Sequence, residues 1–427
     1  GVQTCALPIL GGRGRWLTEQ LGAAAAFGQA PPPRPAATGA PTSEPTRRPD
    51  SPDFITTQRL DARIAPSVTL SDEALTWLFS AAPRSYASLQ QAADAQEDLP
   101  SFRLDGVRIT VHIDADYAVV RTQRTQNVVA TIAGTDPTLK QTYVAIGAHN
   151  DHVGFRPNRP VDHDSVKAFM QIVRPQGADN APTQPTAEQT AQVKALTDSL
   201  RKLHGGARAD SIFNGADDDG SGSVSVMEIA EAFAKTGVKP KRSIIFVWHA
   251  GEEAGLWGSQ YFTDNPTVPR DSIVAQLNMD MVGRGRATDA TGEAKDGSLL
   301  HGGKGYLQLV GSRRLSTELG DLVEAVNKAE KLGFVFDYNI DADGHPQNIY
   351  CRSDHYEYAR YGIPVVFMTT GGHADYHQVT DEPQYIDYDH MADVSRLVMA
   401  SAMKIANLDH RIVVDKPKPN PKGACVQ

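Results

Sequence analysis

The sequence contains little of what several specialised protein classes require. It has three cysteines in 427 residues, at positions 5, 351 and 425, so it indicates no disulfide framework. No activating pattern surrounds Cys351, which is therefore expected to be a small core residue rather than a nucleophile. No apolar run approaches the roughly 18–20 residues that a membrane span requires. The net charge of −9 and the absence of basic clusters argue against nucleic acid as the main partner.

What remains is the composition of a globular protein, 40% hydrophobic and long enough for one large α/β domain with a smaller companion. Residues 1–9, "GVQTCALPI", look like the in-frame translation of a sequencing-library adapter and are excluded from fold reasoning. We therefore expect the native N-terminus to be missing. Residues 10–125 form the predicted companion region, and residues 126–410 the main domain.

The companion region has short structural signals. Residues 31–52 are rich in proline, threonine and alanine, which predicts a disordered or extended segment. The stretch "SDEALTWLF" predicts a helix with Ser71 as its N-cap, and residues 107–123 alternate like a pair of strands.

The main domain alternates buried-strand and helix patterns. Continuous apolar runs predict central strands covered on both faces in "NVVATIAG", "TYVAIGAH", "RSIIFVWHA", "SIVAQLNMDMV" and "IPVVFMTT". Helical patterns lie between and after them, which predicts an α/β class, a three-layer α/β/α sandwich with a mixed, largely parallel central sheet. A polar insertion at 157–213 carries a helix with a capping box at Thr186 and Gln189. Residues 411–427 are expected to be a disordered tail.

Acids and histidines follow the predicted strands at the point where each strand ends. In open α/β sheets this edge binds ligands, so residues far apart in the sequence should converge there. The residues concerned are His149, Asp151, Asp217, Asp218, Asp219, Glu252, Glu253, Asp280, Tyr376 and His377.

So many acids in one cleft would repel one another strongly, and bound divalent metal resolves the conflict. Imidazole and carboxylate ligands without thiolate suit Zn²⁺, with Mn²⁺ or Co²⁺ as substitutes. One catalytic zinc uses about three protein ligands, and the sequence offers more. Two metals that share a carboxylate, roughly 3.5–4 Å apart, would account for the number and would activate a bridging water for hydrolysis.

Five motifs together resemble the bacterial leucyl aminopeptidase family of di-zinc metallopeptidases. They are "AHNDH", "GADDDGSG", "HAGEEAGLWGS", "NMDMVG" and "YHQVTDEP", and the match extends over about residues 127–408. Any one of these motifs alone would be weak, because short acidic and histidine-containing stretches are common. Their joint order at one predicted sheet edge makes the resemblance specific.

The resemblance implies a role for each residue. His149, Asp218 and Asp280 would bind one zinc, and Asp218, Glu253 and His377 the other, with Asp218 as the bridge. A hydroxide would bridge the two ions. Glu252 would be the general base, Asp151 would orient the first histidine, and Tyr376 would donate a hydrogen bond to the tetrahedral intermediate. The family also implies a cis peptide bond between Asp218 and Asp219, and places the segment "RSDHYEYARYGIP" at the substrate pocket.

The chain departs from the simplest members in two places. The first is the insertion at 157–213, in which "PVDHDS" would add a further metal site or a rim to the cleft, although His163 itself is expected to be solvated. The second is the region at 10–125, which resembles the later part of a protease-associated domain whose first half is lost. His345, His355 and His373 are expected to be structural or rim residues.

The sequence therefore predicts a zinc-dependent exopeptidase, with two Zn²⁺ per chain, that removes N-terminal residues from peptides. Alternatives are a carboxypeptidase- or dipeptidase-like member of the same fold, in which Arg284, Arg286 or Arg352 holds the substrate carboxylate, and a single-zinc glutaminyl-cyclase relative. A non-catalytic binding domain is the alternative from another class. Mainly from the resemblance, we expect a secreted or periplasmic protein.

Overall fold

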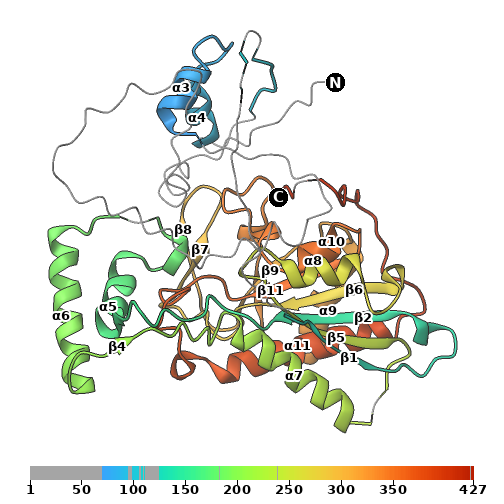
Figure 1. The fold of residues 1–427 in the computed structure, drawn as a ribbon. Coiled ribbons are helices and arrows are strands. Elements are labelled where there is room, and N and C mark those ends of the chain that lie inside the picture. The colour runs from blue at the N-terminus through green and yellow to red at the C-terminus, as the bar shows by residue number, and fades with distance from the viewer. Residues whose placement is uncertain are drawn as a thin grey trace. The chain divides into compact units, whose positions relative to one another are not determined.

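The computed structural model describes residues 70–94, 99–104, 107–108, 110, 125–181, 183–237, 239–423 and 425–427 (Figure 1). The predictions for residues 1–9 and 31–52 lie outside these residues, and the strand pair at 107–123 does so almost entirely. The chain divides into two compact units, residues 1–122 and 123–427.

The smaller unit contains two described helices, α3 (Asp72–Leu78) and α4 (Tyr86–Asp94). Ser71 caps α3 as the sequence predicts, because its side chain accepts a hydrogen bond from the Ala74 amide. Leu78, Tyr86 and Leu89 pack together with neighbouring apolar side chains. The likeness of this unit to a protease-associated domain stays a prediction.

A mixed sheet of seven strands forms the centre of the larger unit. Its order is β1-β5-β2-β6-β11-β9-β10. The bounds are β1 (Val128–Ile132), β2 (Tyr143–His149), β5 (Ser243–His249), β6 (Ile273–Met279), β9 (Tyr306–Val310), β10 (Val335–Asp337) and β11 (Val365–Thr369). Strands β5, β2, β6 and β11 run parallel, whereas β1 pairs with β5 antiparallel. The largely parallel sheet is confirmed.

One strand lies elsewhere than predicted. The run "NVVATIAG" forms β1 at the edge of the sheet, and its residues are exposed or half-buried rather than covered on both faces. The prediction of a central strand was wrong here because an apolar run alone does not reveal which strands flank it.

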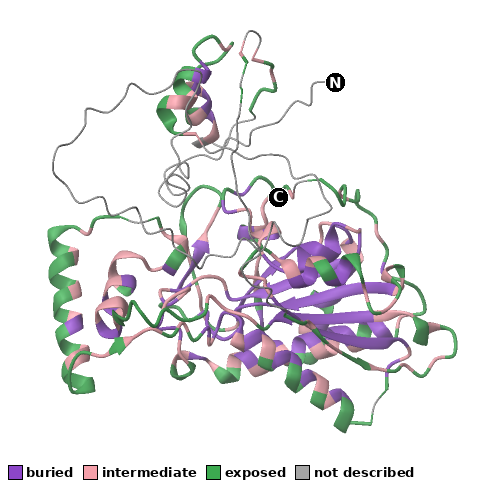
Figure 2. Cartoon of the chain, viewed as in Figure 1, coloured by how far each residue is buried: buried purple, intermediate pink, exposed green. Residues whose placement is uncertain are grey.

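Helices cover both faces of the sheet and complete the three layers (Figure 1). One face packs against α7 (Gly220–Lys235), α9 (Thr317–Glu330) and α11 (Tyr388–Ala406), and the other against α8 (Trp257–Asp264) and α10 (His355–Ala359). Alternate residues of each strand point to opposite faces, so Val144 and Ile146 join the first cluster while Ala145 joins the second. The buried strands in Figure 2 show this double cover.

The insertion is an ordered subdomain within the described residues. It contains β3 (Val161–Asp162), α5 (His163–Val173), the 3₁₀ turn η2 (Gly177–Asp179), α6 (Ala187–His204) and β4 (Ala209–Asp210). The capping box of Thr186 and Gln189 is confirmed. His163 is only 2% exposed, so the expectation that it is solvated was wrong. Its Nδ1 lies 2.7 Å from Nη2 of Arg208, and its Nε2 lies 3.0 Å from a carboxylate oxygen of Glu382.

Residues 411–427 are not the disordered tail that their composition predicts. Cys425 forms a disulfide with Cys351, so Cys351 is not a lone core thiol. The Gln427 side chain accepts a hydrogen bond from the Tyr350 amide and donates to the Ile340 carbonyl. The pairing was missed because two cysteines at a sequence separation of 74 carry no spacing signal.

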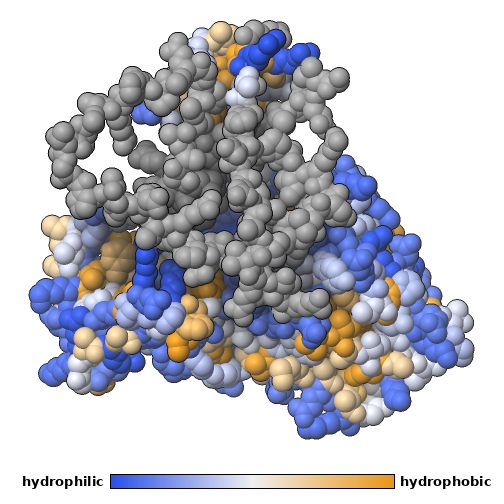
Figure 3. Space-filling view, in the orientation of Figure 1, coloured by the Kyte–Doolittle hydropathy of each residue, from blue (hydrophilic) through white to orange (hydrophobic). Residues whose placement is uncertain are grey.

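The remaining elements are short. The hairpin of β7 (Ala290–Glu293) and β8 (Leu299–His301) stands apart from the main sheet. Single 3₁₀ turns are η1 (Leu139–Gln141), η3 (Arg270–Ser272), η4 (Asn339–Asp341), η5 (Ile349–Cys351) and η6 (Pro383–Tyr385). No described helix combines the length and apolarity needed to cross a membrane. The described surface visible in Figure 3 is mainly hydrophilic, with scattered apolar side chains.

Candidate metal centre

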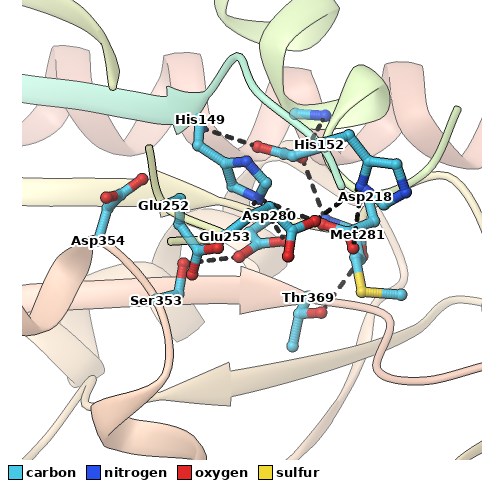
Figure 4. Close-up of polar contacts among 12 residues, drawn as sticks. His149, His152, Asp218, Glu252, Glu253, Asp280, Met281, Ser353, Asp354 and Thr369 are labelled. Atoms are coloured by element: carbon cyan, nitrogen blue, oxygen red, sulfur yellow. Dashed lines mark hydrogen bonds and ion pairs between the residues drawn. The ribbon is translucent and has the colours of Figure 1, made fainter. Parts of the chain in front are cut away.

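The predicted residues meet at the carboxyl edge of the parallel strands, where α/β folds bind ligands (Figure 4). His149 is the last residue of β2, and Asp280 directly follows β6. Glu252 and Glu253 lie in the turn after β5, and His377 lies in the loop after β11. Convergence at this edge, as the sequence indicated, is therefore observed.

The acidic triplet "DDD" is divided by its local structure into three different tasks. Asp219 caps α7 and also accepts a hydrogen bond from the His149 amide. Asp217 accepts one from the Gly283 amide, and the buried Asp381 accepts from the amides of Asp217 and Asp218. The peptide bond between Asp218 and Asp219 is cis, as the resemblance implies. The outer two acids thus serve the backbone, which leaves the Asp218 carboxylate for the cleft.

The first cluster of potential metal ligands consists of His149, Asp218 and Asp280, all buried. Nε2 of His149 lies 3.3 Å from Oδ1 of Asp218 and 3.6 Å from Oδ1 of Asp280. The other oxygen of Asp280 accepts a hydrogen bond from Ser353 at 2.6 Å, which fixes the orientation of this carboxylate.

The second cluster contains Asp218 again, together with His152, Glu253 and His377. Nε2 of His377 lies 3.0 Å from both Oδ2 of Asp218 and Oε2 of Glu253. Asp218 therefore offers one oxygen to each cluster, as a bridging ligand would. His152 was missed by sequence reasoning, although it stands in the quoted "AHNDH" motif, because the family pattern assigned only the first histidine.

Several potential ligand atoms in the two clusters lack hydrogen-bond partners. His149 Nε2, Asp218 Oδ2, Glu253 Oε1 and both ring nitrogens of His152 are buried and make no hydrogen bond within the described part of the chain. Buried polar atoms are almost always paired, so atoms left unpaired and aimed at common points need a ligand. Imidazole and carboxylate donors in sets of three and four fit divalent zinc.

The charges of the site lead to the same conclusion. Burial raises the pKa of Glu252 well above its usual range. Burial acts in that direction on Asp218 too, yet contacts with His149 and His377 hold its pKa well below the usual value. Burial opposes protonation of His377, but the neighbouring carboxylates of Asp218 and Glu253 raise its pKa to about 10. The carboxylates therefore require a positive charge nearby. A bound metal cation supplies that charge while the histidine and carboxylate ligands stay deprotonated.

Glu252 belongs to neither cluster. Its Oε2 lies 4.0 Å from Nε2 of His149, close to the first cluster, whereas Glu253 lies inside the second (Figure 4). The adjacent acids therefore differ in position, because Glu252 approaches His149 of the first cluster while Glu253 contacts His377 of the second.

Asp151 contacts the site differently from what the resemblance implies. Nδ1 of His149 is 2.9 Å from the main-chain oxygen of Asp151 and 3.8 Å from its carboxylate. The carboxylate instead accepts hydrogen bonds from the amides of Gly251 and Glu252, at 2.7 and 3.0 Å, with the Glu253 amide at 3.4 Å. Asp151 thus orients the histidine through its carbonyl and holds the glutamate turn through its side chain.

A pocket opens beside the two clusters, and Tyr376 and Arg352 line it. The location of Arg352 and Ser353 at this pocket agrees with the prediction for "RSDHYEYARYGIP". Part of the wall is apolar and consists of Met281, Ile340, Ile349 and Phe367.

The three histidines expected to be structural or rim residues are buried in other networks. His345 contacts the Glu293 carbonyl, His373 lies 3.2 Å from Asp217, and the ring of His355 stacks on Phe367. All three are buried, so they are structural rather than rim residues.

The sequence predicted a further metal site or a rim of the cleft at "PVDHDS". The structure places His163 of this segment in a third cluster of potential metal ligands, together with Asp210 and Glu382. However, Arg208 lies 2.7 Å from Nδ1 of His163 and 3.0 Å from Asp164. A guanidinium so close to the ring favours an ion-pair network over a metal site, because it already supplies the positive charge.

The chain is similar to several known proteins over part of its length. Leupeptin-inactivating enzyme 1 of Streptomyces exfoliatus is 40% identical over 84 residues, which is 19% of each chain. Leucine aminopeptidase 1 of Penicillium rubens is 26% identical over 202 residues, 45% of this chain and 47% of that protein. The zinc aminopeptidase BSAP from Bacillus subtilis aligns with a TM-score of 0.41 and 18% identity, over 65% of this chain and 49% of that one.

The chain thus spans about half the length, or less, of these relatives. The family comparison covers more of it. Residues 127–402, which contain both clusters and all five motifs, match the sequence model of peptidase family M28. This match extends over more than half of the chain, and the protein therefore belongs to peptidase family M28.

Proposed function

We propose that the protein is a zinc-dependent aminopeptidase that removes N-terminal residues from peptides. The observation that carries this proposal is the pair of clusters sharing Asp218, with Glu252 beside them but outside both. Three predicted ligands surround each position, so we propose two zinc ions per chain. His149, Asp218 and Asp280 would hold one, and Asp218, Glu253 and His377 the other.

Two bound zinc ions would polarise the scissile carbonyl and lower the pKa of the attacking water. The side chains do the rest. Glu252 accepts the proton of that water and then passes it to the leaving amine, a task suited to a carboxyl whose pKa burial raises. Tyr376 donates a hydrogen bond to the oxygen that gains charge as the carbonyl is attacked.

The charges around the pocket favour a free N-terminus over a free C-terminus. Five acids line it, Asp179, Asp218, Glu252, Glu253 and Asp280, against one arginine among the residues that the structure describes. Two divalent ions would neutralise four negative charges, and Arg352 a fifth. A substrate carboxylate would therefore find no unpaired cation among the described lining residues, whereas an ammonium group could donate hydrogen bonds to the carboxylates of Glu252 and Asp280.

The arginines considered for a carboxypeptidase are engaged elsewhere. Arg352 pairs with Asp179 at 2.9 Å, and the buried Arg284 pairs with Asp375 at 3.1 Å. Arg286 is 46% exposed and lies within 4.0 Å of Asp387. Each would have to leave a carboxylate partner to bind a substrate carboxylate, which disfavours this alternative.

The pocket wall supports an apolar first residue. Ile340, Ile349 and Phe367 line the pocket, and burial of an apolar side chain against them contributes about 25 cal/mol per Å². We propose leucine-like side chains as the preferred first residue.

A combined metal analysis and substrate panel tests the proposal. The purified chain, loaded with zinc, should hold two ions and hydrolyse leucyl-anilide faster than aspartyl- or lysyl-anilide. The N-acetylated leucyl-anilide should be inert, because its amide carries no ammonium group.

Other outcomes point to the alternatives. Turnover of an N-blocked peptide ending in glutamate, with none of leucyl-anilide, would indicate a carboxypeptidase. One zinc per chain with cyclisation of N-terminal glutamine would indicate a cyclase. Zinc binding without turnover of any substrate would indicate a binding domain.

We also propose that the protein is secreted or periplasmic. The disulfide between Cys351 and Cys425 supports this proposal, because such bonds persist in oxidising compartments and are rare in the cytosol. Detection of the oxidised pair in protein recovered from the producing cells' exterior would support export, and a fully reduced cytosolic pool would contradict it.

A further inference from the structure

The insertion at 157–213 reaches the loop that carries Tyr376. The amide of Ala178, in the turn η2, donates a hydrogen bond to the Tyr376 carbonyl at 3.1 Å. Gly177 adopts a φ of +62°, and a Cβ there would lie 2.7 Å from that same carbonyl oxygen. A side chain at residue 177 would therefore collide with the loop, so the contact requires glycine.

Asp179, in the same turn, holds an arginine against the tyrosine. Its carboxylate accepts hydrogen bonds from Arg352 at 2.9 and 3.2 Å, through both terminal nitrogens. Nη2 of Arg352 also donates to the Tyr376 hydroxyl at 3.3 Å. The side chain of Arg352 is thus fixed between an acid of the insertion and the phenol of the pocket.

This arrangement determines how the phenol can be used. A guanidinium only donates, so the Tyr376 oxygen must be the acceptor in their contact. The phenol hydrogen is then left for another acceptor. Tyr376 lines the same pocket as Glu252 and Asp218, where charge develops on the substrate oxygen under the proposed mechanism.

The turn itself is well anchored, as a positioning device requires. The buried Gln176 donates from its side chain to Glu293 at 2.8 Å, and its amide donates to the Asn180 side chain at 2.8 Å. Nearby, Lys167 of helix α5 pairs with the buried Asp375 at 2.7 Å, one residue before the tyrosine. The insertion therefore contacts the loop through the Ala178 amide and through Lys167, and it reaches the Tyr376 hydroxyl through Arg352.

We propose that Asp179 is a positioning residue that, through Arg352, directs the Tyr376 phenol to the substrate oxygen. The insertion thereby contributes to catalysis without contacting the reacting atoms. This inference rests on the proposed aminopeptidase function and adds to it a part of the chain that the family motifs do not include.

The test compares two aspartates of the insertion. Asp179→Ala should lower kcat about tenfold or more, a fraction of the roughly 10²–10³ that loss of an oxyanion donor costs. KM should change by less than about threefold, since ground-state binding does not need the phenol hydrogen. Asp198→Ala is the matched control, because Asp198 lies in the insertion but forms an exposed ion pair with Lys194. Asp179→Glu, which keeps the charge, should restore part of the rate.

A double-mutant cycle separates positioning from general damage. Asp179→Ala combined with Tyr376→Phe should be no slower than Tyr376→Phe alone, because the first change acts only through the phenol. Multiplied effects in the double variant, or an Asp179→Ala enzyme as active as the control, would overturn the inference. A wild-type chain that hydrolyses no peptide would overturn the proposed function itself, which is a distinguishable outcome.

A separate observation concerns His152. Its side chain is only 9% exposed, and Nδ1 lies 2.7 Å from Oε1 of Glu253 and 3.5 Å from Oδ2 of Asp218. Neither ring nitrogen has a partner with hydrogen-bond geometry, although the carboxylates lie close, and the four side chains of this cluster are near enough to one another to share one ion. Gly215 lies directly against the ring, where a Cβ would be 2.5 Å from it. We infer that His152 is a fourth protein ligand of the second zinc.

Metal affinity, measured without any assay of activity, tests this inference. His152→Phe keeps the ring and removes the nitrogens, so it should weaken one of the two zinc sites about tenfold or more in a chelator competition. The control is His410→Phe, because His410 is exposed and pairs with Glu318 away from the site. If both variants bind zinc as the wild type does, or if the wild type binds one ion only, His152 is not such a ligand.

Discussion

The adjacent glutamates after β5 provide the sharpest test of the proposed mechanism. Exchanging either for glutamine removes one negative charge while the size of the side chain stays nearly the same. Glu252 lies 4.0 Å from His149 and outside both clusters, whereas Glu253 is 3.0 Å from His377 and inside one. Two isosteric changes at neighbouring positions should therefore have different consequences.

Glu252→Gln should lower kcat by about 10²–10⁴, the usual contribution of a general base. At 1.36 kcal/mol per factor of ten, this corresponds to roughly 3–5 kcal/mol in the activation barrier. The turn should survive, because the main-chain oxygen of residue 252 accepts the amides of Gly255 and Leu256 whatever the side chain. Zinc content should stay at the wild-type value.

Glu253→Gln should also abolish turnover, but through loss of zinc from the second site. The loss of affinity should exceed the roughly tenfold to hundredfold that follows removal of a group that merely supports a ligand. The assay is inductively coupled plasma analysis of dialysed protein, followed by rate measurement at saturating zinc. Equal zinc loss in both variants, or normal hydrolysis by Glu252→Gln, would refute the assignment.

Three further outcomes are expected. Chelation should abolish activity and lower Tm, since the acids then repel one another without a cation, and added zinc should restore both; a chelator-resistant enzyme would contradict the metal centre. Asp381→Ala should weaken both zinc sites in a chelator competition, because Asp381 holds the backbone of the shared Asp218; unaltered affinity would show that this support is dispensable. Cys425→Ser should lower Tm by several degrees, because the disulfide with Cys351 closes a sequence separation of 74 and contributes up to about 4.5 kcal/mol to stability. It should also raise KM for leucyl-anilide, because the C-terminal segment that the disulfide holds anchors the pocket wall at Ile340. A wild-type melting curve would contradict the expected loss of stability.

Sequence patterns predicted the α/β class and most central strands of the main domain correctly, and they assigned the candidate site residues to the sheet edge where the structure brings them together. Strands β2, β5, β6 and β11 could be predicted from continuous apolar runs, because central parallel strands are buried on both faces. The acids and histidines after them were placed at one edge by the rule that parallel strands end together. Edge strand β1 has the same kind of run, so its position could not be read from composition.

Other features could not be predicted for identifiable reasons. His163 has charged neighbours in the sequence, which suggested exposure. Its contacts Arg208 and Glu382 lie far away in the sequence, and they offset the cost of burying its polar ring. The polar segment at 411–427 looks disordered, but a disulfide and the contacts of Gln427 hold it in place. The role of the Asp151 carboxylate depended on a turn conformation that no spacing encodes.

The sequence by itself determined the α/β class, the sheet edge that carries the chemistry and the acids and histidines gathered there, because these follow from local periodicity and from motif order. Only the tertiary structure decided that Asp218 faces the cleft while Asp217 and Asp219 bind backbone, and that Glu252 lies outside the clusters that Glu253 joins. It also brought His152 and the insertion's Asp179 to the site. These roles depend on which carboxylate oxygens and amide groups face each other in the folded chain. The order of residues in the sequence does not specify the direction in which a side chain points.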